Sequence, residues 1–185
     1  IKFLGNISSE RYFLNAFTFG ITGFSAKLIH EKGYKKTKFS YFTKGIQSLF
    51  QYSPQTVDLF SNEEKLYKGP IIIVALANGQ YFAAGMKIAP EANLQSGHFH
   101  AILVRKGGKR DLLKKFFSVY AGKHIDGDLV KLFKIDNLSA SSSFDVPSEF
   151  DGEEGPNLPF EAKCLKQTLP LLSLIHISEP TRLGM

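Results

Sequence analysis

One short acidic segment carries the residue types with the clearest chemistry. Residues 150–154 read Phe-Asp-Gly-Glu-Glu. Asp151 and Glu153 are two positions apart, so an extended backbone would point both carboxylates the same way. Gly152 has no side chain, which would let a phosphate or a metal approach the backbone. One carboxylate could hold Mg²⁺ on a nucleotide while the other takes a proton from a hydroxyl. Asp-Gly also forms hairpin turns, so a structural role stays open.

The histidines and the cysteine suggest less. His98 and His100 alternate and would share one face of a strand, but the sequence places no third metal ligand beside them. We therefore expect an ordinary surface or core pair. Cys164 is the only cysteine, which excludes an internal disulfide and a cysteine-based metal cluster and favours a reducing compartment. We expect Cys164 to be a small buried apolar residue.

Charge is segregated along the chain, which has a net charge of +6. Residues 27–44 hold six lysines against one acid, and residues 105–123 hold seven basic residues against Asp111 alone. Residues 136–154, in contrast, contain six acids and no lysine or arginine. This distribution is consistent with a basic face toward phosphates and an acidic loop toward a metal or a proton. Solvated helix surfaces would give the same pattern.

The hydrophobic pattern predicts the elements that must position these groups. Strands are expected at 12–19, 71–77, 99–104, 130–135, 143–146 and 160–165, and helices at 24–31, 38–51 and 109–121. The run 71–77 is continuously apolar and should be buried on both faces, whereas 139–143 reads as a polar loop. In the last helix we expect a buried stripe of Leu112, Leu113, Phe116, Phe117 and Tyr120, with Arg110, Asp111, Lys114 and Lys115 facing water. The predicted class is α+β with β dominant.

Length and composition bound the organisation. The chain has 185 residues, 43% apolar and 22% charged, which excludes a disordered or fibrous protein and suggests one domain. No apolar run approaches the ~18 residues that span a bilayer. The start at Ile1 suggests a fragment. Residues 173–185 match no element and look like translated sequencing-adapter read-through, so we expect a native domain over 1–172.

Several motifs occur in an order that carries a resemblance. The chain resembles the diacylglycerol kinase and sphingosine kinase family of lipid kinases in Tyr12-Phe13-Leu14-Asn15 with Gly20, Asn78-Gly79 through Met86, Ile88 through Leu94 with Gly97, Gly122-Lys123-His124 after a helix, and Asp151-Gly152-Glu153. Each motif is short, but their order covers residues 12–172.

The resemblance implies an antiparallel β-sandwich with a few flanking helices, the C-terminal domain of a lipid kinase. In that family an α/β domain with a glycine-rich ATP segment precedes it, and no such segment occurs here. The expected reaction is transfer of the γ-phosphate of ATP, with Mg²⁺, to a hydroxyl of diacylglycerol or a sphingoid base. By carry-over, Glu153 is the general base, and Asp151, with Gly152 beside it, helps place the Mg²⁺ of the nucleotide. The chain alone should be inactive.

The sequence also departs from the family. Ala83-Ala84-Gly85 stands where three glycines are common, and alanine does not easily adopt a positive φ. Ser96 and His100 stand where some members have the acids of a second, structural metal site.

A different class of function remains open, a non-catalytic lipid- or membrane-binding β-sandwich. We expect a cytoplasmic protein that touches membranes peripherally through 27–44 and 105–123, with Arg110, Lys114 and Lys115 on one helix face. The sequence contains no recognition motif that combines aromatic and basic residues, so we expect no nucleic-acid partner.

Overall fold

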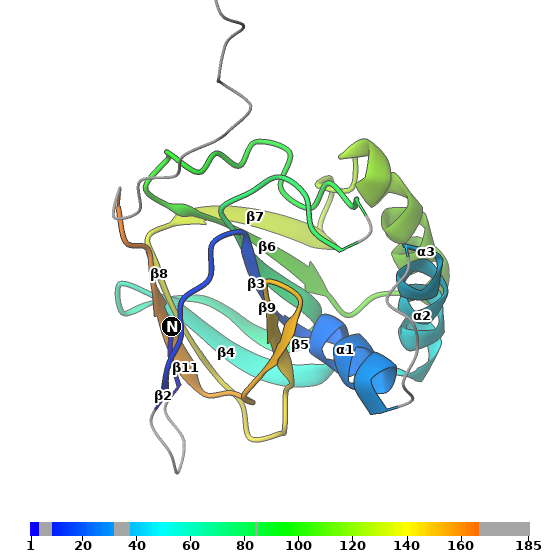
Figure 1. The fold of residues 1–185 in the computed structure, drawn as a ribbon, viewed down its shortest axis with the longest axis horizontal. Coiled ribbons are helices and arrows are strands. Elements are labelled where there is room, and N and C mark those ends of the chain that lie inside the picture. Colours follow the sequence, from blue (N-terminus) through cyan, green and yellow to red (C-terminus); the bar gives the residue numbers. More distant parts are fainter. Residues whose placement is uncertain (4–8, 32–37, 84, 167–185) are drawn as a thin grey trace, which may run out of the picture.

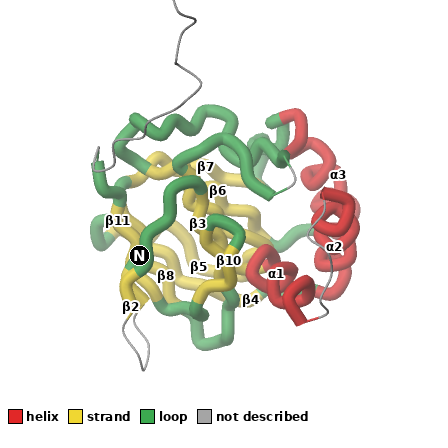
Figure 2. Tube along the Cα trace, viewed as in Figure 1, coloured by secondary structure: helices red, strands yellow, loops and turns green. Residues whose placement is uncertain are grey.

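A long antiparallel sheet that curls on itself forms the body of the protein (Figures 1 and 2). The computed structural model describes residues 1–3, 9–31, 38–83 and 85–166. Within them the strands are β1 (Lys2–Phe3), β2 (Ser9–Glu10), β3 (Ala16–Gly20), β4 (Gln55–Ser61), β5 (Glu64–Ala77), β6 (Phe99–Arg105), β7 (Val130–Ile135), β8 (Asn137–Ser141), β9 (Ser148–Phe150), β10 (Glu153–Gly155) and β11 (Phe160–Lys163). Their order is β10-β9-β3-β5-β4-β8-β11-β1-β2, and β6 pairs with both β5 and β7.

Three α-helices gather on one side of this sheet (Figure 1). They are α1 (Ile21–Glu31), α2 (Lys38–Gln51) and α3 (Lys109–Ser118), and the 3₁₀ turn η1 (Val119–Ala121) continues α3. The layers confirm the predicted β-dominant class and its sandwich-like architecture. None of the helices in the described part is long and apolar enough to span a membrane.

Strand β5 separates two hydrophobic cores. Val74 and Leu76 face the core inside the curled sheet, whereas Ala75 and Ala77 face the core under the helices. This alternation follows from the period of two along a strand. A register shift against β6 at the start of the run puts neighbouring Ile72 and Ile73 on the helix side together. The predicted burial of 71–77 on both faces is confirmed.

Phenylalanine rings fill the inner core in place of tryptophan. Phe160 meets Phe17 and Phe19 edge-on, with centroids 4.8 and 5.2 Å apart. Phe13, just before β3, stacks on Phe99 at 5.5 Å. Offset and edge-on pairs of this kind contribute about 0.5–1.5 kcal/mol beyond the area they bury. Through Phe13 the loop before β3 is therefore anchored in the core.

Three of the sequence expectations are wrong. Residues 139–143, predicted as a loop, lie largely in β8, and the expected strand at 143–146 lies instead at β9. Strand β4 is not predicted from the sequence, because its buried apolar residues Val57 and Leu59 are few and lie within a largely polar stretch. The turn that joins β4 to β5 is formed by Asn62 and Glu63, both at positive φ (48° and 66°), and lacks the glycine that usually marks such a turn.

His100 makes the stability of this fold depend on pH. The ring is buried on β6, and burial lowers its pKa below the ordinary value of 6.5; the charges of His98 and Lys134 add to this, and Glu91 opposes it. As the pH falls through 6.5 the unfolded chain takes up a proton first, so the free energy of unfolding falls. We expect His100→Gln to flatten this dependence in urea titrations between about pH 7.5 and 5.5. An unchanged slope in the variant would contradict a neutral, buried His100.

Candidate functional site

The Asp-Gly pair of the acidic segment forms the tight turn of the β9–β10 hairpin. Phe150 and Glu153 are directly paired, which leaves Asp151 and Gly152 as a two-residue loop. Both have positive φ, 49° and 89°, as a type I′ turn requires. The expectation that an extended backbone aligns the two carboxylates is therefore wrong, because a turn separates them.

The carboxylate of Asp151 accepts three backbone hydrogen bonds. Its Oδ2 accepts from the N–H of Leu14 at 2.7 Å, and its Oδ1 accepts from the N–H groups of Asn15 and Ala16 at 3.0 and 2.9 Å. The N–H of Asp151 in turn donates to the carbonyl of Ala16. A carboxylate has about four lone-pair directions, so most of this acceptor capacity is used within the protein. Asp151 ties the hairpin to the beginning of β3.

The Asn-Gly turn that follows β5 reaches the same place. The N–H groups of Asn78 and Gly79 donate to the carbonyl of Asn15 at 2.9 and 3.2 Å. The side-chain amide of Asn15 donates to the backbone carbonyl of Tyr81, and the side-chain amide of Asn78 donates to the backbone carbonyl of Leu14. A Cβ on Gly79 would lie 2.2 Å from Oδ1 of Asn15, so a larger residue there would displace the side-chain amide of Asn15 from its present position. Three segments far apart in the sequence thus converge, and we call this set of contacts the latch.

The two glutamates after the turn face opposite sides of the hairpin. Glu153 is exposed and shares a face with Phe150, whose ring packs against the inner core. Glu154 lies opposite Glu149, so it shares the other face. Glu149 lines a pocket under the helices.

The remaining residues singled out from the sequence lie apart from the turn. Ser96 and His98 line an open groove of about 800 Å³ together with Tyr12–Leu14 and Asn78. His98 Nδ1 lies 3.1 Å from the carbonyl of Ser96, and the rings of His98 and His100 are 5.1 Å apart. In the described residues no three His, Cys, Asp or Glu side chains come close enough to form a metal site. Cys164 lies half-buried at this groove, and burial raises its pKa.

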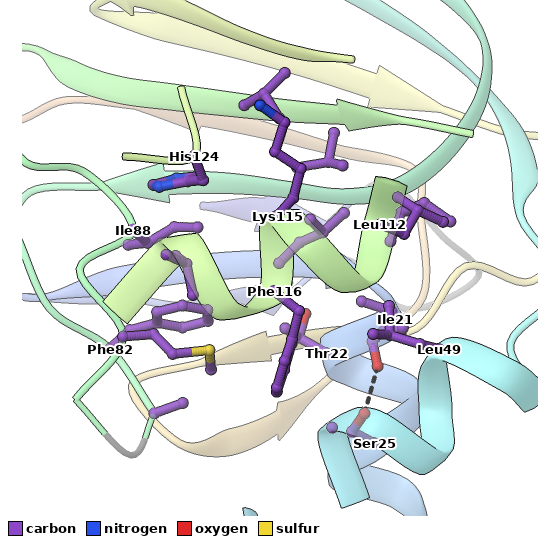
Figure 3. Close-up of a pocket in the computed structure, with 18 of the residues that line it drawn as sticks. Ile21, Thr22, Ser25, Leu49, Phe82, Ile88, Leu112, Lys115, Phe116 and His124 are labelled. Atoms are coloured by element: carbon purple, nitrogen blue, oxygen red, sulfur yellow. Dashed lines mark hydrogen bonds between the residues drawn. The ribbon is translucent and has the colours of Figure 1, made fainter. Parts of the chain in front are cut away.

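An apolar pocket of about 130 Å³ lies between the sheet and the helices (Figure 3). In Figure 3, Ile21, Ser25 and Leu49, which belong to α1 and α2, lie toward the Leu112 end of α3, and Phe82, Ile88 and His124 lie toward its other end. The hydroxyl of Ser25 donates a hydrogen bond to the carbonyl of Ile21 at 2.8 Å, and it lies 2.7 Å from the hydroxyl of Ser48. The rim includes Ala83 and Glu149.

His124, Thr22 and Lys115 are among the polar side chains that line this pocket. His124 is 2% exposed, and neither of its ring nitrogens has a hydrogen-bond partner among the described residues; the same holds for Oγ1 of Thr22. Burial lowers the pKa of His124, the backbone of Ile88 opposes this in part, and the charge of Lys115 adds to it. Lys115 forms an ion pair with Asp126.

This position of Lys115 corrects the prediction that it faces water. Only 21% of its side chain is exposed, and it contributes to the pocket beside Leu112 and Phe116. Phe117, predicted in the buried stripe, is instead 51% exposed and shares the outer face of α3 with Arg110 and Lys114. The helix is therefore rotated relative to the predicted stripe. The lysines at 27–38 have side chains outside the described residues.

Ala83 holds a strained backbone conformation at a position where a glycine would be unstrained. It adopts a φ of 43° in the loop where Phe82 pairs with Met86. A left-handed conformation costs an L-residue about 1–2 kcal/mol. The loop thus keeps the backbone path that glycine would allow, at the expense of local strain at the rim of the pocket.

Sequence reasoning found the latch residues but missed their contacts. It gave no role to His124, Thr22 or Glu149 and placed Lys115 on the water-facing side of its helix, since nothing in a single sequence indicates which polar residues of two helices, a strand and a loop will line one cavity. The helical spacing of Leu112, Phe116 and Val119 could have indicated the apolar wall.

Replacing Asp151 should loosen the latch. In Asp151→Ala the N–H groups of Leu14, Asn15 and Ala16 lose their acceptor, and we expect a loss of about 2 kcal/mol in the free energy of unfolding. Hydrogen exchange should accelerate at these three amides. Glu154→Gln, an exposed carboxylate on the same hairpin, is the control and should change neither quantity. Unchanged exchange in Asp151→Ala would contradict the latch.

Comparison with known proteins gives this arrangement a family. The model of the "YegS C-terminal NAD kinase beta sandwich-like domain" matches residues 15–173. A diacylglycerol kinase of Staphylococcus carnosus is 29% identical over 89% of this chain and 53% of its own length. One from Bacillus subtilis is 23% identical over 67% of this chain and 41% of its own length.

Solved structures show the same fold. A crystal structure of a diacylglycerol kinase from Bacillus anthracis superposes with a TM-score of 0.54 at 16% identity, covering 83% of this chain and 47% of that one. The chain thus spans about half the length of the first curated relatives it matches. On the match over residues 15–173, it belongs to the family of YegS C-terminal, NAD kinase β-sandwich-like domains, the C-terminal domain region of diacylglycerol kinase homologues.

Proposed function

We propose that this chain is the lipid-binding, C-terminal domain of an ATP-dependent lipid kinase that phosphorylates a hydroxyl of diacylglycerol or a sphingoid base. The apolar pocket is the observation that carries the proposal. Its rim includes Glu149, two residues before the Asp-Gly turn, and Ala83, in the loop that follows the Asn-Gly turn. An apolar chain seated there would leave its polar end at the side of the molecule where the latch brings three motifs together.

The size of the pocket limits what enters it without rearrangement. A cavity of about 150 Å³ lined by apolar residues holds a molecule such as benzene, and this pocket has about 130 Å³. It therefore holds a short part of a lipid chain. A longer part requires movement of α1 and α2 away from the sheet, because both helices line the pocket, α1 through Ile21, Thr22, Ser25 and Ala26 and α2 through Gly45 and Leu49.

Glu153 is the proposed general base. Its carboxylate is exposed and directly follows the turn that the latch holds in place. It lies on the hairpin face opposite Glu149, so the hydroxyl of a lipid seated in the pocket would reach it around the turn. Most of the acceleration in phosphoryl transfer comes from positioning and charge neutralisation, so a fixed turn matters as much as the base itself. Glu153 would accept the proton of the lipid hydroxyl as the hydroxyl attacks the γ-phosphate.

Asp151 enters the proposal mainly as a positioning residue. Three of its lone-pair directions are taken by backbone N–H groups, and the one that remains is what it would offer to Mg²⁺. That cation commonly takes one or two carboxylates and completes its shell with water and nucleotide phosphates. When bound, Mg²⁺ would neutralise phosphate charge, and the bare backbone of Gly152 would leave room for a phosphate beside the turn.

The nucleotide would be held by a further domain. The curated relatives are about twice as long as the part this chain matches. Tyr12, Leu14 and Tyr81 expose 71%, 53% and 52% of their surface beside the latch. Such a patch of large apolar side chains fits a surface that another domain covers. The 185-residue chain alone, mixed with Mg-ATP and lipid, should form no phospholipid.

The test of the general base is Glu153→Gln in a longer parent that includes the nucleotide-binding domain. Loss of the proton acceptor should lower kcat by about 100-fold or more, with little change in KM for the lipid. Glu161→Gln, which removes an exposed carboxylate from β11, is the matched control and should retain activity. Normal turnover of Glu153→Gln would remove this residue from the mechanism.

The engagement of Asp151 favours a second candidate, a lipid-binding domain without catalysis. A carboxylate that already accepts three hydrogen bonds is a weak metal ligand, and Ser96 stands where the related kinases often have an acid. The two proposals separate in the same assay. A parent that binds lipid but forms no product with Mg-ATP is a binding protein.

The outer face of α3 is the proposed membrane contact. Arg110, Lys114 and Phe117 are exposed one turn apart, and Lys109 lies 5.3 Å from the centroid of the Phe50 ring. A basic residue near an anionic bilayer contributes about 1 kcal/mol. We expect Arg110→Glu with Lys114→Glu to weaken sedimentation with phosphatidylserine vesicles about tenfold or more. Parent binding should also weaken with added salt, because the Debye length shrinks from about 10 Å at 0.1 M to about 3 Å at 1 M.

The control for this face is Lys131→Glu, an exposed lysine on β7. It should bind vesicles as well as the parent does. Binding that ignores salt, or a double variant that binds normally, would place the membrane contact elsewhere.

A further inference from the structure

His124 is the least satisfied polar side chain of the pocket. It is 2% exposed, and neither ring nitrogen has a hydrogen-bond partner among the described residues. Native proteins leave few buried polar groups unpaired, because each one loses its hydrogen bonds to water without replacement. The backbone of Ile88 lies close enough to raise the pKa of the ring, but it forms no hydrogen bond with either ring nitrogen. The side chain therefore has bonding capacity that the described protein does not use.

The surroundings of the ring restrict what could use this capacity. Phe82 and Ile88 lie at this end of the pocket (Figure 3), and Met86, which also lines the pocket, pairs with Phe82. A buried water molecule typically needs two to four polar partners, and the side chains of Phe82 and Ile88 at this end supply none. Lys115 is already paired with Asp126. An apolar molecule that carries its own polar group fits this environment better than water does.

The protonation state decides which polar group fits. Burial and the nearby charge of Lys115 both lower the pKa of the ring, so the imidazole is neutral near pH 7. A neutral imidazole has one N–H donor and one acceptor nitrogen. A hydroxyl group can bond to either nitrogen, because it both donates and accepts. Because the neutral ring carries no charge, it would not form an ion pair with a charged group of the ligand.

We propose that His124 is a specificity-determining residue that hydrogen-bonds a hydroxyl group carried by the apolar molecule in this pocket. The inference rests on the proposed function only for the natural ligand, which would be a lipid with a hydroxyl on the part of its chain that enters the pocket. A site built to pair with a hydroxyl discriminates against an analogue that lacks it, since the protein group is then left unpaired.

Phenol and toluene test this pairing directly. They differ by a hydroxyl in place of a methyl group, and both are benzene rings with one substituent, close in size to the ligand of a comparable apolar cavity. Titrations of the 185-residue chain, followed by calorimetry and by the ring ¹⁵N shifts of His124, should show tighter binding of phenol. Only phenol should shift the ring nitrogens, because only phenol forms the hydrogen bond. Equal or tighter binding of toluene, or no binding of either probe, would overturn the proposal.

Two variants separate hydrogen bonding from shape. His124→Leu should lower the preference for phenol over toluene by about tenfold or more, whereas His124→Gln keeps a donor and an acceptor and should retain most of it. If the variants do not fold, the ring shifts of the parent chain decide by themselves. The test needs no nucleotide and no kinase activity. A chain that prefers phenol while its longer parent fails to phosphorylate lipid would refute the proposed function and leave this inference standing.

Discussion

The hydrogen bonds that converge on the carboxylate of Asp151 hold together the end of this domain where the β9–β10 hairpin meets the start of β3. Leu14, Asn15 and Ala16 lie where the chain enters β3, and their N–H groups need acceptors that no neighbouring strand supplies in full. One carboxylate provides them. Strand pairing joins β3 to β9 and to β5. The carboxylate of Asp151 and the carbonyl of Asn15, which accepts from Asn78 and Gly79, extend these connections to the hairpin turn and to the Asn-Gly turn.

The pocket has a different physical origin, in how the helices meet the sheet. Strand β5 presents Ile72, Ile73 and the small Ala75 to the helices. Gly45 of α2 lies so close to the ring of Phe116 that an added Cβ would be 3.1 Å from it. Helices α2 and α3 are thus in close contact where Gly45 meets Phe116, and the space beside this contact remains open. Small residues at the helix contact and on the sheet leave a cavity that larger ones would fill.

The sequence predicted the architecture better than the geometry of its site. Apolar runs such as 71–77 and the helical period of 38–51 gave most elements, because burial produces those patterns directly. Asp151 was read as half of a pair on extended backbone, although Asp-Gly is also a type I′ turn, and a local pattern cannot reveal acceptors for amides 135 to 137 residues away. The rotation of α3, which turns Lys115 inward and Phe117 outward, depends on where α2 packs, and no period within 109–121 encodes that.

The exposure of Glu153 bears on how the proposed reaction would be completed. A carboxylate in water is solvated, and its interaction with a developing positive charge is weakened by the high dielectric constant around it. It becomes an effective base once water is excluded and the reacting groups are fixed. This chain fixes the turn but leaves it open to solvent, with Tyr12 and Leu14 exposed at the same edge. In the proposed reaction the latch would form one wall of the site, and the proposed second domain would supply the nucleotide and exclude the water.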